Sequence, residues 1–182
     1  MTGVVLSGGK STRMGKDKGL VMYRNAPLIS HALKILSSQL SEVLISTNNT
    51  EYSIFNYPLI ADIIPEIGPL GGIFSAMDKL NSDGYLFMAC DIPEFGSDIL
   101  GQMLDSAEQA DVVFLEIATG NPQPLPVYLG AGTYYLMKKM IGRHDYKLQN
   151  IFSYAKEDPD LKVKTVMLDQ ELRNINKPTD LE

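Results

Sequence analysis

The sequence predicts an α/β fold in which a Rossmann-like, mostly parallel sheet carries helices on both faces. Short apolar segments alternate along the chain with segments of helical period, and a glycine-rich loop follows the first apolar segment. With 182 residues and 45% hydrophobic content, the chain is long enough for one well-buried core. We therefore expect a single domain that spans residues 1–182.

The apolar segments are the predicted strands. Their apolar character is continuous and not alternating, so we expect both faces of each strand to be covered. They comprise residues 4–6, 43–46, 59–61, 85–89 and 112–115. Because strand, helix and strand follow one another repeatedly, the strands should be parallel and joined by right-handed crossovers.

Helical spacing is clearest after Pro27, which suits the first turn of a helix. Apolar residues then recur at intervals of three and four, which predicts one buried helix face. They are Leu28, Ile29, Ala32, Leu33, Leu36 and Leu40. Further helices are predicted over residues 72–80, 98–109 and 133–140.

Charge is unevenly distributed along the chain, whose formal net charge is −6. Residues 1–24 hold five basic side chains against one carboxylate, a net of +4, which leaves −10 for the remainder. An acidic protein with one basic loop suits a small polyanion better than a nucleic-acid backbone. No apolar run is long enough for a membrane span and no signal peptide is recognisable, so we expect a cytoplasmic protein without membrane or nucleic-acid partners.

The basic loop occupies residues 7–18 and begins directly after the first predicted strand. Gly8 and Gly9 lack a Cβ, so their backbone N–H groups can approach phosphate oxygens closely. Arg13 and Lys18 add positive charge. This pattern favours a triphosphate-binding loop, with an ordinary solvated surface loop as the alternative.

Three better-known loops are excluded by spacing. A Walker-type P-loop needs a glycine where this chain has Val4, and a nucleophile elbow needs one where it has Arg13. A dinucleotide-binding fingerprint needs its first two glycines separated by one residue, whereas Gly8 and Gly9 are adjacent. The loop is therefore of another phosphate-binding type.

Two carboxylates follow other predicted strands, at the sheet edge where α/β proteins bind ligands. Asp91 ends a strongly apolar run, and Mg²⁺ accepts such a carboxylate together with substrate phosphates, so Asp91 is the candidate metal ligand. A helix cap or an ion pair with a lysine is the alternative. Asp62 is a weaker candidate because aspartate also forms turns. The glycines of residues 68–72 open a helix whose N–H groups could receive an anion or a base edge, or they form only a tight turn.

These motifs, in their order and spacing, resemble the molybdenum cofactor guanylyltransferase family over essentially the whole chain. The motifs are residues 6–18, Asp62, residues 68–72, residues 90–93 and residues 174–178. The resemblance implies a fold like that of nucleotide-diphospho-sugar transferases. It also implies transfer of GMP from GTP to the phosphate of molybdopterin or molybdenum-molybdopterin, with release of pyrophosphate.

The resemblance further implies a role for each matching residue. Leu6, Ser7 and Gly8 would meet the guanine and ribose, with Gly9 in the same nucleotide site and Asp62 on the nucleoside. Lys18 would bind the phosphates, Arg13 would grip the β- and γ-phosphates, and Asp91 would hold Mg²⁺; these three are the candidate catalytic residues. Transient contact with molybdoenzymes or insertion factors is also implied.

This sequence departs from the family pattern at three places. Ser7 stands where alanine is more common, Ser46 where relatives often have asparagine, and residues 120–125 show only the general form of the acceptor-side segment. A molybdopterin cytidylyltransferase or another small nucleotidyltransferase is the alternative enzyme. A nucleotide-binding regulatory module is the alternative outside enzymes, although it would not need Arg13, Lys18 and Asp91 together.

Overall fold

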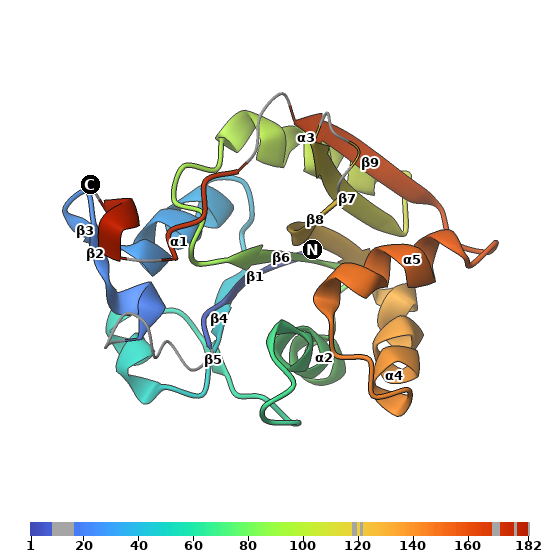
Figure 1. Ribbon diagram of the computed structural model, residues 1–182, viewed down its shortest axis with the longest axis horizontal. Coiled ribbons are helices and arrows are strands. Elements are labelled where there is room, and N and C mark those ends of the chain that lie inside the picture. Colours follow the sequence, from blue (N-terminus) through green and yellow to red (C-terminus); the bar gives the residue numbers. More distant parts are fainter. Residues whose placement is uncertain (9–16, 118–119, 121, 169–171, 177, 182) are drawn as a thin grey trace.

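The computed structural model describes residues 1–8, 17–117, 120, 122–168, 172–176 and 178–181. The described strands of its central sheet are β1 (Thr2–Leu6), β4 (Val43–Ser46), β5 (Leu59–Ile60), β6 (Gly84–Ala89), β7 (Val112–Ile117), β8 (Pro122–Gly130) and β9 (Val163–Leu168). They lie side by side in the order β5-β4-β1-β6-β8-β7-β9 (Figure 1). A small separate sheet pairs β2 (Met22–Tyr23) with β3 (Ala26–Pro27).

The central sheet is mostly parallel, as predicted. β1 pairs in parallel with β4 on one side and with β6 on the other, and β5 extends the β4 side. β8 alone among the described strands of this sheet runs antiparallel to its neighbours, β6 and β7, while β9 is parallel to β7. Because the chain leaves β1 toward β4 and later returns to its other side as β6, the order of strands reverses between β1 and β6. Ligands of α/β proteins bind at such a switch point, beyond the carboxyl ends of the strands.

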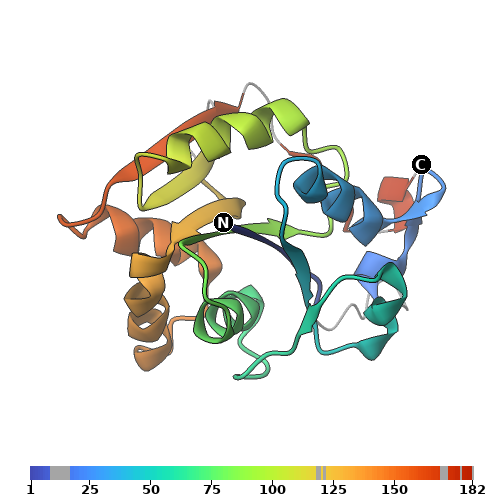
Figure 2. The ribbon, with the colours of Figure 1, turned by 180° about the vertical axis from the view of Figure 1, so that it is seen from behind.

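Helices cover both faces of the sheet, as Figures 1 and 2 show from opposite sides. α1 (Leu28–Ser37) and α3 (Ser97–Ala107) lie on one face, and α2 (Pro69–Lys79), α4 (Tyr134–Gly142) and α5 (Ile151–Lys156) lie on the other. Successive strand residues point to opposite faces, so Val4 packs into the core beneath α2 and α4 while Val5 packs into the core beneath α1 and α3. Each face therefore has its own apolar core.

Most differences from the predicted elements lie at their ends. The strand over residues 43–46 has its predicted bounds, but α2 begins at Pro69 and not at Gly72, because proline suits the first helical turn. α1 ends at Ser37, so Leu40 lies beyond the helix and packs against the same core from the following turn. β2, β3, β8, β9 and α5 were not predicted. Within the described residues, no helix combines the length and apolarity that a membrane span needs.

Candidate functional site

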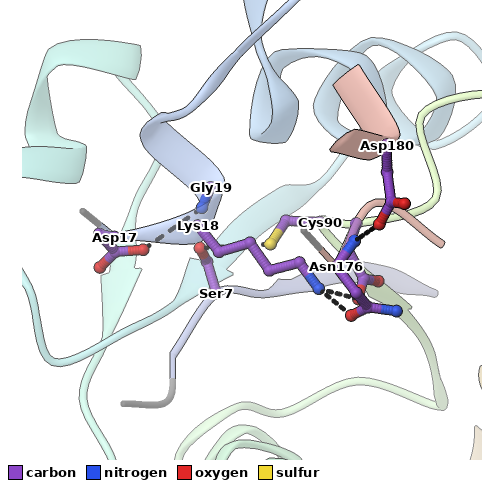
Figure 3. Close-up of polar contacts among 8 residues, drawn as sticks. Ser7, Asp17, Lys18, Gly19, Cys90, Asn176 and Asp180 are labelled. Atoms are coloured by element: carbon purple, nitrogen blue, oxygen red, sulfur yellow. Dashed lines mark hydrogen bonds and ion pairs between the residues drawn. The ribbon is translucent and has the colours of Figure 1, made fainter. Parts of the chain in front are cut away.

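Lys18 forms the centre of a polar cluster at the switch point between β1 and β6. Its Nζ atom donates to Asp91 Oδ2 at 2.6 Å and to Asn176 Oδ1 at 2.6 Å (Figure 3 shows Lys18 reaching toward Asn176). Asp91 follows β6, whereas Asn176 comes from the C-terminal part of the chain. The side chains of Lys18 and Asp91 are each 20% exposed, so water screens this ion pair only partly. The ion pair with a lysine was the alternative prediction for Asp91.

The C-terminal segment is held in place on both sides of Asn176. The Ile175 N–H donates to the Asp91 carbonyl oxygen at 2.9 Å, and the Ile175 side chain is fully buried with Tyr23 and Leu28. The Asn176 N–H donates to Asp180 Oδ2 at 2.7 Å. One apolar anchor and two backbone hydrogen bonds thus bring the Asn176 amide to Lys18.

Ser7, at the end of β1, turns its side chain into the protein. It is 1% exposed, its Oγ donates to the Tyr52 hydroxyl at 2.6 Å, and its N–H donates to the Ser46 carbonyl oxygen at 2.9 Å. Cys90 Sγ lies 3.6 Å from Ser7 Oγ, and burial raises the pKa of this thiol to about 12, so the thiol stays protonated at neutral pH. Because the Ser7 hydroxyl is buried and hydrogen-bonded to Tyr52, a nucleotide beside this residue would contact its main chain.

Asp62 belongs to a second group of contacts, on the β4–β5 side of the site. Its N–H donates to Asn48 Oδ1 at 2.9 Å, and the Asn48 Nδ2 group donates back to Asp62 Oδ2 at 3.2 Å. Burial raises the pKa of Asp62, and the hydrogen bond from Asn48 and the charge of Lys79 oppose that rise. A half-buried carboxylate held in one orientation suits a ligand that donates N–H or O–H groups.

The glycines at the start of α2 have a packing reason. A Cβ on Gly72 would lie 2.5 Å from Ser46 Oγ and 2.9 Å from Leu6 Cδ2, and one on Gly71 would lie 2.9 Å from the Ile64 carbonyl oxygen. Only glycine therefore lets this helix start approach the ends of β1 and β4 so closely. Gly68, just before the helix, has φ +68° and supplies the turn. Both features belong to the tight turn that was the alternative prediction for residues 68–72.

The oxygen atoms around Lys18 are suitable ligands for a divalent cation that completes its coordination shell with other groups. Two oxygen atoms, one carboxylate and one amide, converge on a single cationic atom there. Among the residues that the structure describes, no group of three or more His, Cys, Asp and Glu side chains could form a metal site. A carboxylate oxygen and an amide oxygen are ligands that hard divalent cations accept, with phosphates and water completing the shell.

The predicted site residues are only partly described. Lys18 and Asp91 are in contact, Leu6 and Ser7 are buried at the end of β1, and Gly8 is exposed, with no atom of the described residues, its chain neighbours aside, within 4 Å of an added Cβ. Gly9 and Arg13 lie outside the described residues. Sequence reasoning gave no role to Tyr52 or Asn48 and left open whether Asn176 helps to hold the metal or the acceptor. The motif at residues 174–178 was the only signal that pointed to any of them.

Comparison with known proteins identifies the family of this chain and agrees with its fold. The sequence model of the MobA-like NTP transferase domain matches residues 3–159. A molybdenum cofactor guanylyltransferase from Haemophilus influenzae is 32% identical over 186 aligned positions, which cover 100% of this chain and 96% of that relative.

Solved structures share the fold at lower identity. Molybdopterin-guanine dinucleotide biosynthesis protein A from Archaeoglobus fulgidus has a TM-score of 0.78 and 22% identity, covering 100% of this chain and 95% of that one. Rv0371c from Mycobacterium tuberculosis H37Rv, in complex with manganese, has a TM-score of 0.74 and 14% identity, covering 98% and 94%. With the domain match and the full-length relationship, the chain belongs to the MobA-like NTP transferase domain family.

Proposed function

We propose that the protein transfers GMP from GTP to the phosphate of molybdopterin, releasing pyrophosphate and forming molybdopterin guanine dinucleotide. The observation that carries this proposal is the Lys18 ammonium group held between Asp91 and Asn176 at the switch point of the sheet. A cation fixed at the carboxyl ends of parallel strands suits a nucleotide phosphate. The full-length relationship to molybdenum cofactor guanylyltransferases supports the choice of nucleotide and acceptor.

The reaction needs no nucleophile from the protein. A phosphate monoester has a second pKa of about 6, so the acceptor phosphate is already largely a dianion at neutral pH. One of its oxygens attacks the α-phosphorus of GTP, and the bond from that phosphorus to the bridging oxygen breaks. The electron pair and the negative charge leave with pyrophosphate. The task of the protein is therefore to align two anions and to stabilise charge on the leaving group.

Lys18 is positioned for that task. An ammonium group has three N–H donors, so Lys18 can exchange a protein oxygen for a phosphate oxygen without leaving the site. We assign Arg13, in the loop just before it, to the β- and γ-phosphates on the basis of the family motif. Their positive charge would offset repulsion between the nucleotide and the acceptor phosphate.

Asp91 and Asn176 are the residues that would hold a divalent cation, through the two oxygen atoms that now face Lys18. When bound, such a cation supplies further positive charge at the phosphates. We infer that it is Mg²⁺, which prefers oxygen ligands and substrate phosphates.

The nucleoside is assigned to the β4–β5 side of the site. Asp62, held by Asn48, would accept hydrogen bonds from the nucleoside, and residues 6–8 would line the path to the phosphates. One continuous sheet takes its strands from both halves of the chain, so we propose that the whole chain acts as one nucleotidyltransferase unit. Delivery to molybdoenzymes or insertion factors is an extension of the family resemblance.

Pyrophosphate release from the purified protein tests this function. GTP, CTP, UTP and ATP are each supplied with MgCl₂ and molybdopterin, and reactions without molybdopterin control for simple hydrolysis. We expect release that needs both GTP and molybdopterin. A preference for CTP would replace the guanylyl assignment with a cytidylyl one. If no nucleotide gave pyrophosphate, the proposal that the protein is a nucleotidyltransferase would be refuted.

A further inference from the structure

Tyr52 is the one fully buried residue of its short 3-10 helix, which spans Thr50–Phe55 after β4. Its hydroxyl accepts a hydrogen bond from Ser7 Oγ at 2.6 Å and donates one to Asp17 Oδ1. Ser7 is the first residue of the basic loop, residues 7–18, and Asp17 is the last but one. A single phenol oxygen therefore joins the two ends of that loop.

The direction of these hydrogen bonds follows from the groups involved. A carboxylate only accepts, so the Tyr52 O–H must donate to Asp17. The phenol oxygen then accepts the single hydrogen of Ser7, whose Oγ also lies 3.6 Å from Cys90 Sγ. Burial raises the pKa of Tyr52, and the bond to Asp17 raises it further, so the phenol keeps its hydrogen. The chain of bonds has one orientation, and Tyr52 is its central member.

The backbone closes tightly over this hydroxyl. A Cβ on Gly19 would lie 2.5 Å from Ser7 Oγ and would also meet the Tyr52 hydroxyl. Asp17 is held further by the Gly19 N–H at 3.3 Å and by Asn49 Nδ2 at 3.2 Å (Figure 3 shows Asp17, Gly19, Ser7 and Lys18 together). Lys18 lies between Asp17 and Gly19 in the chain, so any shift of Asp17 also shifts the backbone of Lys18.

We propose that Tyr52 is a positioning residue: its hydroxyl fixes the two ends of the basic loop, Ser7 and Asp17, against each other and thereby holds Lys18 in reach of Asp91. This inference rests on the proposed function, because it gives Lys18 a nucleotide phosphate to bind. Tyr52 itself need not touch the nucleotide. Its contribution is that Lys18 is already in place when the nucleotide arrives, so less freedom is lost on binding.

The test compares two buried tyrosines that differ in location. Tyr52→Phe removes the hydroxyl at the loop, and Tyr85→Phe removes one that donates to the Leu80 carbonyl oxygen, near the start of β6 and away from the site. Calorimetric titration with GTP and MgCl₂ measures the Kd of each variant. We expect Tyr52→Phe to weaken GTP binding about tenfold, which corresponds to about 1.4 kcal/mol. Tyr85→Phe should bind GTP as the wild type does, although both variants lower Tm.

A double-variant cycle separates positioning from a general loss of structure. If Tyr52 acts through Lys18, adding Tyr52→Phe to Lys18→Ala should weaken GTP binding no further than Lys18→Ala alone. Gly19→Ala provides a second route, because the new Cβ displaces the same hydroxyl while Tyr52 is kept. It should weaken binding in the same direction, which keeps the inference testable should Tyr52→Phe fail to fold.

The inference is overturned if Tyr52→Phe binds GTP as tightly as Tyr85→Phe, or if Gly19→Ala binds GTP as the wild type does. It is also overturned if adding Tyr52→Phe to Lys18→Ala weakens GTP binding by the same factor as Tyr52→Phe does in the wild type. Failure of the proposed function is distinguishable from these results. A wild-type protein that binds CTP and not GTP overturns the guanylyl assignment, and the Tyr52 comparison is then made with CTP. A wild-type protein that binds no nucleoside triphosphate overturns both.

Discussion

Replacing Ile175 with alanine should release the C-terminal segment that brings Asn176 to Lys18. Ile175 is fully buried with Tyr23 and Leu28, so the substitution removes roughly three buried carbon groups at about 0.8 kcal/mol each, or about 2.4 kcal/mol. That energy shifts the equilibrium between docked and undocked segment about 60-fold. Ile175→Val removes about one such group, which predicts a shift of only about fourfold.

Hydrogen exchange at residue 175 measures this shift directly, because its N–H donates to the Asp91 carbonyl oxygen in the docked state. We expect exchange up to about 60-fold faster in Ile175→Ala and about fourfold faster in Ile175→Val, with unchanged protection of the β1 amides as the control. The kcat/KM for GMP transfer should fall in the same order. Unchanged exchange in Ile175→Ala would refute the anchoring, and faster exchange with wild-type kcat/KM would refute a role for Asn176.

Three further predictions concern activity, pH and packing. Lys18→Ala should lower kcat/KM about 10²–10³-fold in the pyrophosphate assay, because it removes a donor that stabilises charge on the leaving group. Lys34→Ala, on the exposed face of α1, should leave kcat/KM unchanged. Equal kcat/KM for the two variants would contradict the assignment of Lys18. Burial raises the pKa of Asp62, so its ionisation costs the native state stability as pH rises above about 4, the ordinary carboxyl pKa. Asp62→Asn should therefore raise Tm at pH 7 but not below a pH of about 4. A lower Tm of Asp62→Asn at pH 7 would contradict a destabilising charge at this position. Gly72→Ala places a Cβ 2.5 Å from Ser46 Oγ and should destabilise the protein by about 1–3 kcal/mol, measured in thermal melts. An unchanged Tm would contradict a packing requirement for glycine at the start of α2.

Local sequence patterns predicted the half of the sheet that carries the site. Continuous apolar segments predicted β1, β4 and β6 because these strands are buried on both faces, and helical spacing predicted α1. β8 was missed because Pro122, Pro124 and Pro126 argue against a strand, yet the strand forms opposite β7 with a register shift between Phe114 and Leu115. β9 is an edge strand whose last three residues alternate between buried and exposed, which is a weaker signal than a continuous apolar run.

For the site, the rule that ligands bind beyond the carboxyl ends of parallel strands was enough to predict that the loop after β1 and Asp91 lie close together. The contact between Lys18 and Asp91 confirms that proximity. The roles of Tyr52 and Asn176 depend on contacts between distant parts of the chain, which no local spacing reveals. Likewise, that the Ser7 hydroxyl points inward follows only from the position of Tyr52.

A crystal structure with a non-hydrolysable GTP analogue and Mg²⁺ tests the central claim most directly. We predict phosphate oxygens within hydrogen-bonding distance of Lys18 Nζ, the cation on Asp91, and the nucleoside beside Asp62 on the β4–β5 side of the site. A nucleotide bound elsewhere, with Lys18 still hydrogen-bonded to Asp91 and Asn176 and to no phosphate, would contradict the account.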